Sequence, residues 1–133
     1  MKKHIEVVAA VLMHHGLFLA VQRAESNLYY ISKKWEFPGG KVEQGESLDD
    51  AIKRELIEEL DIVIDKPQFF MTVEHSYPDF DITMHCFICE LESERIELKE
   101  HVDQRWLVRD DLMTVDWAEA DIPAVQKLMS SAI

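Results

Sequence analysis

Hydrophobic runs at the start of the chain predict paired β-strands. His4 to Met13 is almost continuously apolar and indicates a buried strand, and Leu17 to Arg23 indicates a second one. Between them, His14-His15-Gly16 predicts a turn, so we expect a hairpin with both histidines exposed to solvent. A polar segment from Ala24 to Lys34 is interpreted as a loop beside a pocket, and Trp35-Glu36-Phe37 predicts a short third strand.

Two longer apolar segments in the second half of the chain predict another strand pair. They run from Ile62 to His75 and from Ile82 to Leu91, around a turn formed by Tyr77 to Asp81. A charged stretch from Glu92 to Asp103 follows, and Gln104 to Val108 predicts one more short strand. We expect the two long segments to pair antiparallel.

Helical patterns are confined to two segments. Ser47 to Leu60 contains good helix formers without Gly or Pro, and Ser47 is a candidate N-cap, with Asp50 three residues later. A second, amphipathic helix begins at Asp121, a candidate N-cap, with Pro123 near its first turn. Strands before, between and after two helices predict an α/β fold, a sandwich of helices on a mixed sheet.

Three glutamates extend the inward face of the first helix. Glu55, Glu58 and Glu59 lie within an arc of about 100°, because i+3 and i+4 neighbours share a helix face. The same arc carries the apolar residues of the first turns, Leu48, Ala51 and Ile52. Clustered carboxylates near a core are unfavourable unless a cation neutralises them. This coincidence favours a divalent metal site over the alternative, a solvated acidic face.

Composition limits the partners of the protein. A chain of 133 residues with 47% hydrophobic content fits one domain, residues 1–133. The net charge of −12 disfavours nonspecific binding to duplex nucleic acid, and an anionic substrate would need a metal ion to approach this surface. The longest N-terminal apolar run, Val7 to Met13, is too short to cross a bilayer. We therefore expect a cytoplasmic protein that does not bind membranes.

The two cysteines predict no metal or redox site. Cys86 and Cys89 form a C-x-x-C inside a strand-like apolar run, without a second pair. Their odd separation in a strand points the two side chains to opposite faces of the sheet. We expect both to be structural.

The acidic helix and the Pro38-Gly39-Gly40 turn before it together resemble the Nudix box. That motif places Gly, Glu, Arg-Glu, Glu-Glu and aliphatic residues at fixed spacing. The matching positions here are Gly40, Glu46, Arg54-Glu55, Leu56, Glu58-Glu59 and Ile62. Asp61 stands where the family has Gly. That departure weakens the helix C-cap rather than the chemistry, because Asp tolerates the left-handed conformation better than most residues.

Residues outside the box resemble the MutT branch of the family. They are Arg23, segment 34–41, Tyr77-Pro78-Asp79, Ile82-Thr83, Lys99-Glu100 and segment 120–123. The resemblance implies a Nudix-type α/β/α sandwich with a mixed sheet. It also implies hydrolysis of a nucleoside triphosphate to the monophosphate and pyrophosphate. Members of the branch act on oxidised nucleotides such as 8-oxo-dGTP, and a sub-branch prefers CTP and 5-substituted dCTP.

The resemblance also implies site residues. The metal ligands would be the Gly39 carbonyl and the carboxylates Glu55, Glu58, Glu59 and Glu100, holding Mg²⁺, with Mn²⁺ as an alternative. Arg54 would orient these carboxylates by bidentate pairing. Glu55 is the first choice for orienting or deprotonating the attacking water, and Glu100 is the second. Substrate would be bound by Arg23, Glu36, Phe37, Pro38, Gly39, Gly40, Lys41 and Asp121.

Several of these residues have a purely structural alternative. Phe37 could pack in the core, Arg23 could be a surface cation, Glu46 could be a first-turn acid, and Asp121 could cap the last helix. Related MutT proteins carry Asn at the position of Asp121, so guanine and cytosine both remain open as the preferred base.

Alternative functions and either quaternary state also remain open. One alternative is a Nudix hydrolase of another substrate such as ADP-ribose or a dinucleoside polyphosphate. Another is a non-catalytic nucleotide-binding regulator, against which the retained acidic cluster argues. The sequence does not distinguish a monomer from a homodimer.

Overall fold

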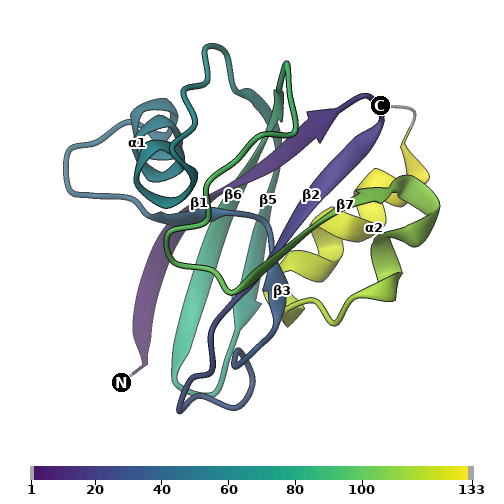
Figure 1. Cartoon of the computed structure of the whole chain (residues 1–133). Coiled ribbons are helices and arrows are strands. Elements are labelled where there is room, and N and C mark those ends of the chain that lie inside the picture. The colour runs from purple at the N-terminus through teal and green to yellow at the C-terminus, as the bar shows by residue number, and fades with distance from the viewer. Residues whose placement is uncertain (1, 132–133) are drawn as a thin grey trace.

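Strand β1 (Lys3–His14) is the centre of a seven-stranded mixed sheet. On one edge it runs parallel to β6 (Phe80–Glu90) along almost its whole length, from the pair Lys3 and Phe80 to the pair Met13 and Glu90. On the other edge it pairs antiparallel with β4 (Gly39–Lys41) and then with β2 (Leu17–Gln22). The computed structural model describes residues 2–131 of the chain (Figure 1).

The remaining strands extend the sheet on both sides. Strand β5 (Gln68–Ser76) pairs antiparallel with β6, as the sequence predicts. Strand β2 pairs antiparallel with β3 (Trp35–Glu36) on one edge and with β7 (Asp103–Val108) on the other. Helices α1 (Leu48–Leu60) and α2 (Ile122–Ser130) lie on opposite sides of this sheet (Figure 1), which confirms the predicted α/β/α sandwich. Neither helix is long and apolar enough to span a membrane.

The β1–β2 hairpin closes through a two-residue turn. His15 and Gly16 both have positive φ, 48° and 78°, the geometry that matches the twist of paired strands. His14 belongs to β1 and is buried, and its Nδ1 lies 2.9 Å from the carbonyl oxygen of Leu91. The prediction that both histidines are exposed is therefore wrong for His14 and confirmed for His15. The loop after β6 covers His14.

Alternating side chains of the central strands build two cores. Val8, Ala10 and Leu12 of β1 pack on the α1 side of the sheet, whereas Ala9 and Val11 pack on the α2 side. Cys86 belongs to the α2-side core and Cys89 to the α1-side core, and both are buried and free. The predicted structural role of the two cysteines, on opposite faces, is confirmed.

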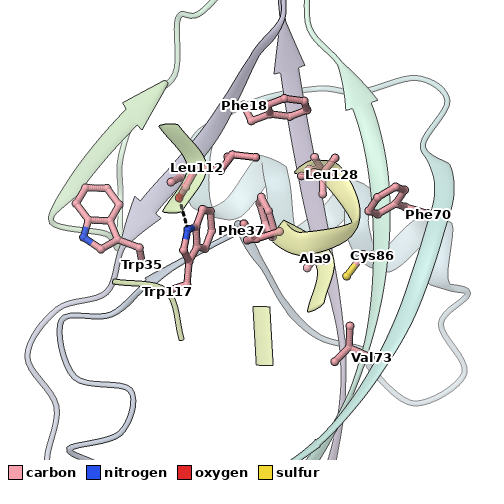
Figure 2. Close-up of a cluster of buried hydrophobic side chains, with 14 of the residues drawn as sticks. Ala9, Phe18, Trp35, Phe37, Phe70, Val73, Cys86, Leu112, Trp117 and Leu128 are labelled. Carbon is pink, nitrogen blue, oxygen red and sulfur yellow. Dashed lines mark hydrogen bonds between the residues drawn. The ribbon is translucent and has the colours of Figure 1, made fainter. Parts of the chain in front are cut away.

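Large aromatic side chains fill the α2-side core. Figure 2 shows Phe37 beside the last helix, with Trp117 next to it, and Trp35 farther out in the same cluster. The rings of Phe37 and Trp117 are 4.7 Å apart, and the Trp117 indole N–H donates to the Leu112 carbonyl at 2.6 Å. This packing fixes the end of β3, and so the chain that enters the Pro38-Gly39-Gly40 turn, against the start of α2.

Helix α1 has the predicted ends. The Ser47 hydroxyl accepts a hydrogen bond from the Asp50 N–H at 3.1 Å, and Asp61 ends the helix in the left-handed conformation, with φ 56° and ψ 41°. The predicted strand from Ile62 is wrong in its first part, because β5 begins only at Gln68. Ile62 and Ile64 are apolar because they pack into the α1-side core, not because their backbone joins the sheet.

Replacing Asp61 by Gly should leave the free energy of unfolding unchanged or raise it by up to about 1 kcal/mol. Glycine removes left-handed strain and takes an acid away from the negative end of the helix dipole. Urea denaturation measures the effect, and Asp65→Gly is the matched control. Asp65 is exposed and does not have positive φ, so glycine there should only add flexibility to the unfolded chain. A marked loss of stability in Asp61→Gly would reveal a specific bond made by the Asp61 side chain.

Candidate active site

A cavity of about 630 Å³ opens on the α2 side of the sheet, within the size range of small-molecule sites. It lies between the loop after β2, the β3–β4 turn, the end of α1 and the start of α2. Its lining includes these residues predicted from the sequence: Arg23, Glu36, Phe37, Gly39, Gly40, Lys41, Glu59, Glu100 and Asp121. Glu55 lies behind Gly40, and the Pro38 carbonyl accepts the N–H of Ala10 in β1 at 2.7 Å.

The two glycines let the backbone reach the carboxylates of α1. The Gly39 N–H donates to Glu59 Oε1 at 3.1 Å. A side chain at Gly40 would overlap the carboxylate of Glu55, and one at Gly39 would overlap the backbone of Val8. Only glycine fits at both positions, so the turn and the helix form one closely packed unit.

Glu55 and Glu59 are carboxylates in a poorly solvated place. Their exposed fractions are only 9% and 8%. Burial, followed by the charges of Glu55, Glu36 and Glu100, raises the pKa of Glu59 to about 9. Burial also raises the pKa of Glu55, whose Oε2 is buried without a hydrogen-bond partner among residues 2–131. A cation would supply the missing partner and favour the ionised forms.

Arg54 makes its best bonds to Glu46. Its Nε and Nη2 donate to the two carboxylate oxygens of Glu46 at 2.7 and 3.0 Å, and Nη2 also donates to the Lys41 carbonyl at 2.9 Å. The two bonds from Arg54 to Glu46, together with one from the Glu43 N–H, lower the pKa of Glu46 to about 2. Contacts of Arg54 to Glu58 and Glu55 are longer, 3.3 and 3.5 Å. Arg54 therefore fixes the loop before α1 to the helix, and Glu46 is its partner rather than a simple first-turn acid.

The remaining two predicted ligands lie at the rim. Glu58 lies at the edge of the buried face of α1, so 55% of its side chain is exposed, and there it pairs with Arg54 Nη1 at 3.3 Å. The predicted inward arc is therefore wrong for Glu58 and confirmed for Glu55 and Glu59. Glu100 is also exposed, but its charge raises the pKa of both buried glutamates, so it faces the same site.

The residues present fit a divalent cation that shares its ligands with a substrate. In the described part of the chain no three His, Cys, Asp or Glu side chains are arranged to hold a metal ion by themselves. Mg²⁺ commonly uses only one or two protein carboxylates and completes its shell with water and substrate phosphates. Glu55, with its unpaired oxygen, and Glu59 beside the Gly39 backbone offer such ligands.

Glu59 should link the stability of the cation-free protein to pH. The ordinary pKa of its carboxyl is 4.5 and the folded value is about 9, so the folded state holds a proton that the unfolded state has released. The protonated Glu59 therefore contributes to the free energy of unfolding. This contribution is complete below the unfolded pKa and is lost as the pH rises toward 9. In EDTA, we expect Tm to fall between about pH 6 and about pH 9, and to fall less in Glu59→Gln.

Mg²⁺ should counter this loss, raising Tm more at the higher pH, because the ionised carboxylate binds it. Thermal melts of wild type and Glu59→Gln with EDTA or MgCl₂ measure both effects. Equal pH slopes for the two proteins in EDTA would contradict the role given to Glu59.

Asp121 lies at the other end of the cavity and occupies the predicted N-cap position of α2, but its side chain makes no capping hydrogen bond. Only 5% of it is exposed, and its Oδ2 accepts the Phe37 N–H at 2.8 Å. The predicted capping bond is therefore wrong. A 3₁₀ turn, η2 (Glu119–Asp121), runs directly into α2, so Asp121 already has helical dihedrals and its side chain reaches across to β3. Burial, and then the charge of Glu36, raises the pKa of Asp121 well above its usual range.

Glu36 lies between the two ends of the cavity. Its Oε1 accepts from Arg23 Nη1 at 3.2 Å, and its Oε2 lies 2.9 Å from His101 Nε2. Arg23 is thus paired at the cavity and is not an isolated surface cation. His101 was not among the site residues predicted from the sequence. Only its position next to Glu100 in a charged loop indicated a possible role. The contact joins residues 65 positions apart, which no local pattern reveals.

Aromatic residues form the remaining wall. The Phe37 side chain is buried in the α2-side core, as the packing alternative predicted, while Phe37 also lines the cavity. The ring of Tyr77 stacks on Tyr30 at 5.1 Å, and its hydroxyl oxygen accepts the Ala120 N–H at 2.9 Å. The Tyr30 hydroxyl donates to Asp79 at 2.6 Å. These contacts attach the predicted pocket loop, residues 24–34, to the turn between β5 and β6.

Comparison with known proteins identifies the family. A family model described as the NUDIX domain matches residues 2–128. The chain is 36% identical over 101 residues to an 8-oxo-dGTP diphosphatase of Proteus vulgaris, covering 74% of this chain and 88% of the relative. It is 33% identical over 129 residues to a CTP pyrophosphohydrolase of Escherichia coli, covering 96% and 93%.

A solved structure supports the same assignment. The crystal structure of a MutT protein from Methanosarcina mazei superposes with a TM-score of 0.82 at 25% identity, covering 96% of this chain and 94% of that one. Gly40 and Glu59 of the matching box line the cavity, and the family model spans nearly the whole chain. The protein belongs to the Nudix family of hydrolases, enzymes that act on phosphoric anhydrides.

Proposed function

We propose that the protein is a Mg²⁺-dependent nucleoside triphosphate pyrophosphohydrolase that removes unwanted nucleotides, releasing a nucleoside monophosphate and pyrophosphate. The relatives named 8-oxo-dGTP diphosphatase and CTP pyrophosphohydrolase support this reaction class and two candidate bases. The observation that carries the proposal is one cavity with two chemically different ends. Buried Glu59 lies against the Gly39-Gly40 turn at one end, with Glu55 behind it, and buried Asp121 lies at the other.

The acidic end suits the triphosphate. Glu55 and Glu59 would hold Mg²⁺, with the Gly39 carbonyl, Glu58 and Glu100 as further candidate ligands; Mn²⁺ is the alternative ion. When bound, the ion supplies neutralisation of phosphate charge and a lowered pKa of water. Lys41, on β4, lines the same cavity and offers an ammonium to phosphate oxygens. Arg54 keeps the loop and helix in register through Glu46.

Glu55 is the first candidate for activating water. Its Oε2 has no partner among the described residues and is held next to Gly40, so this one oxygen serves either as a metal ligand or as the acceptor of a proton from the attacking water. Water adds to the α- or β-phosphorus and the bond from that phosphorus to the oxygen bridging α and β breaks, so that the monophosphate and pyrophosphate separate. Glu100 is the second candidate for this role.

The opposite end suits the base. Asp121 uses Oδ2 for the Phe37 N–H, which leaves Oδ1 for a base edge. Arg23 and Glu36 flank this end, and Tyr77 provides an aromatic wall. The net charge of −12 supports free nucleotides, held through Mg²⁺, rather than polymeric nucleic acid as the substrate.

Product analysis tests the reaction. With each of 8-oxo-dGTP, dGTP, CTP and dCTP, we expect phosphorus NMR to show pyrophosphate and the monophosphate, because the bridge between the α- and β-phosphorus is broken. Release of orthophosphate and a diphosphate would mean that the reaction is a simple phosphatase reaction. Including ADP-ribose and a dinucleoside polyphosphate tests the other Nudix activities. No turnover of any substrate, with tight nucleotide binding, would instead support a regulator.

A further inference from the structure

The loop between β6 and β7 brings Glu100 to the acidic end of the cavity. Backbone bonds fix the loop on both sides of this residue: the Lys99 N–H donates to the Glu59 carbonyl at 3.2 Å, and the Val102 N–H donates to the Gln22 carbonyl at 3.0 Å. Between these two points Glu100 lines the cavity and is exposed. The direction of Glu100 therefore depends on how its neighbour is held.

His101 is held by a single strong contact. Only 5% of its side chain is exposed, and its Nε2 lies 2.9 Å from Glu36 Oε2. Arg23 donates to the other oxygen of the same carboxylate. Glu36 thus accepts both bonds, so Nε2 of His101 carries the hydrogen. His101 Nδ1 is buried without a partner among residues 2–131, which leaves the bond to Glu36 as the polar contact that orients this ring.

Repulsion between carboxylates makes such a contact necessary. Glu36, Glu59 and Glu100 line the same cavity, so the three carboxylates lie near one another. Like charges repel one another, which disfavours an inward position of Glu100. The bond from His101 pulls the loop inward, onto a carboxylate that Arg23 already compensates.

We propose that His101 is a positioning residue that holds Glu100 over the phosphate end of the cavity by donating a hydrogen bond to Glu36. This inference rests on the proposed pyrophosphohydrolase function and adds to it a residue that lies outside the box. The hydrogen bond from His101 to Glu36 also connects the two ends of the cavity, because Glu36 precedes Phe37, whose N–H donates to Asp121. Loss of the bond should misplace Glu100 without removing any group that contacts substrate.

Kinetics of four variants test the proposal. His101→Leu and His101→Ala remove the donor, and His101→Gln keeps one. His85→Leu is the matched control, since His85 Nε2 makes a similar contact, 2.8 Å to Glu6 Oε1, outside the cavity lining. We expect the Leu and Ala variants to lower kcat about tenfold or more, with KM for the nucleotide changed less than about threefold, because a small displacement of a reacting group is costly. His101→Gln should recover most of kcat, and His85→Leu should match wild type.

A double-mutant comparison shows whether His101 acts through Glu100. Adding His101→Leu to Glu100→Gln should lower kcat little further, because the group being positioned is already lost. The same fold loss in both backgrounds, or no loss in wild type, would overturn the proposal. Hydrogen exchange of residues 97–103 gives a readout independent of activity: exchange should be faster in His101→Leu and His101→Ala, and normal in His101→Gln. If wild type hydrolyses no nucleotide, the proposed function fails, while unchanged exchange would separately refute the positioning role.

Discussion

Glu59→Gln and Glu55→Gln should each lower kcat more than tenfold, at least about 1.4 kcal/mol of activation free energy. Gln keeps the shape of the side chain, and at position 59 it keeps an acceptor for the Gly39 N–H. It removes the negative charge that a cation requires, so the apparent affinity for Mg²⁺ should fall together with turnover. Steady-state kinetics over a range of Mg²⁺ concentrations measure both quantities.

Three comparisons separate this effect from unfolding. Glu58→Gln should lose less activity than Glu59→Gln, because most of the Glu58 side chain is in solvent. Asp49→Asn removes the same charge from the exposed first turn of α1 and should keep kcat. Glu59→Gln should melt no lower than wild type in EDTA, since it removes a carboxylate that burial disfavours. Full activity of both Glu55→Gln and Glu59→Gln would rule out the acidic site as the catalytic centre.

Asp121 should decide which base is accepted. Asp121→Asn should change the ranking of substrates. The amide of Asn always offers one NH₂ donor group and one oxygen acceptor, whereas the hydrogen-bond donors and acceptors of a carboxyl group depend on its protonation. Asp121→Ala should abolish the ranking, at about 1–3 kcal/mol for each lost hydrogen bond. Measuring kcat/KM for 8-oxo-dGTP, dGTP, dCTP and dUTP with the three proteins tests this expectation.

Stability measurements provide the control for Asp121. Asn retains an acceptor for the Phe37 N–H, so its Tm should stay near that of wild type, whereas Ala leaves this buried N–H unpaired. A purely structural role predicts that Ala lowers Tm and leaves the substrate ranking unchanged. In that case the base is read elsewhere, with Arg23 and Tyr77 as the nearest candidates.

Local features of this protein were predictable because they depend on neighbouring residues. The hairpin, the limits of α1 with its Ser47 and Asp61 ends, and the opposite directions of Cys86 and Cys89 follow from periodicity and from capping chemistry. The association of the glycine turn with the carboxylates of α1 was predicted through the resemblance to the Nudix box, in which these residues stand at fixed spacing.

Burial of individual side chains required the tertiary structure. One helix arc predicted three inward glutamates, yet Glu58 lies at the edge of the buried face and pairs with Arg54, while Glu59 meets the Gly39 backbone. The apolar run from Ile62 was predicted as strand because hydrophobicity does not distinguish packing into a core from pairing in a sheet.

The base end of the site was decided by long-range contacts alone. Asp121 meets Phe37 across 84 residues of sequence, His101 meets Glu36 across 65, and Ala120 meets Tyr77 across 43. The sequence determined which of these groups could donate or accept a hydrogen bond. The choice of partner depended on how the two layers of helices pack on the sheet. A contact between residues far apart in the chain leaves no periodic pattern in the sequence near either of them.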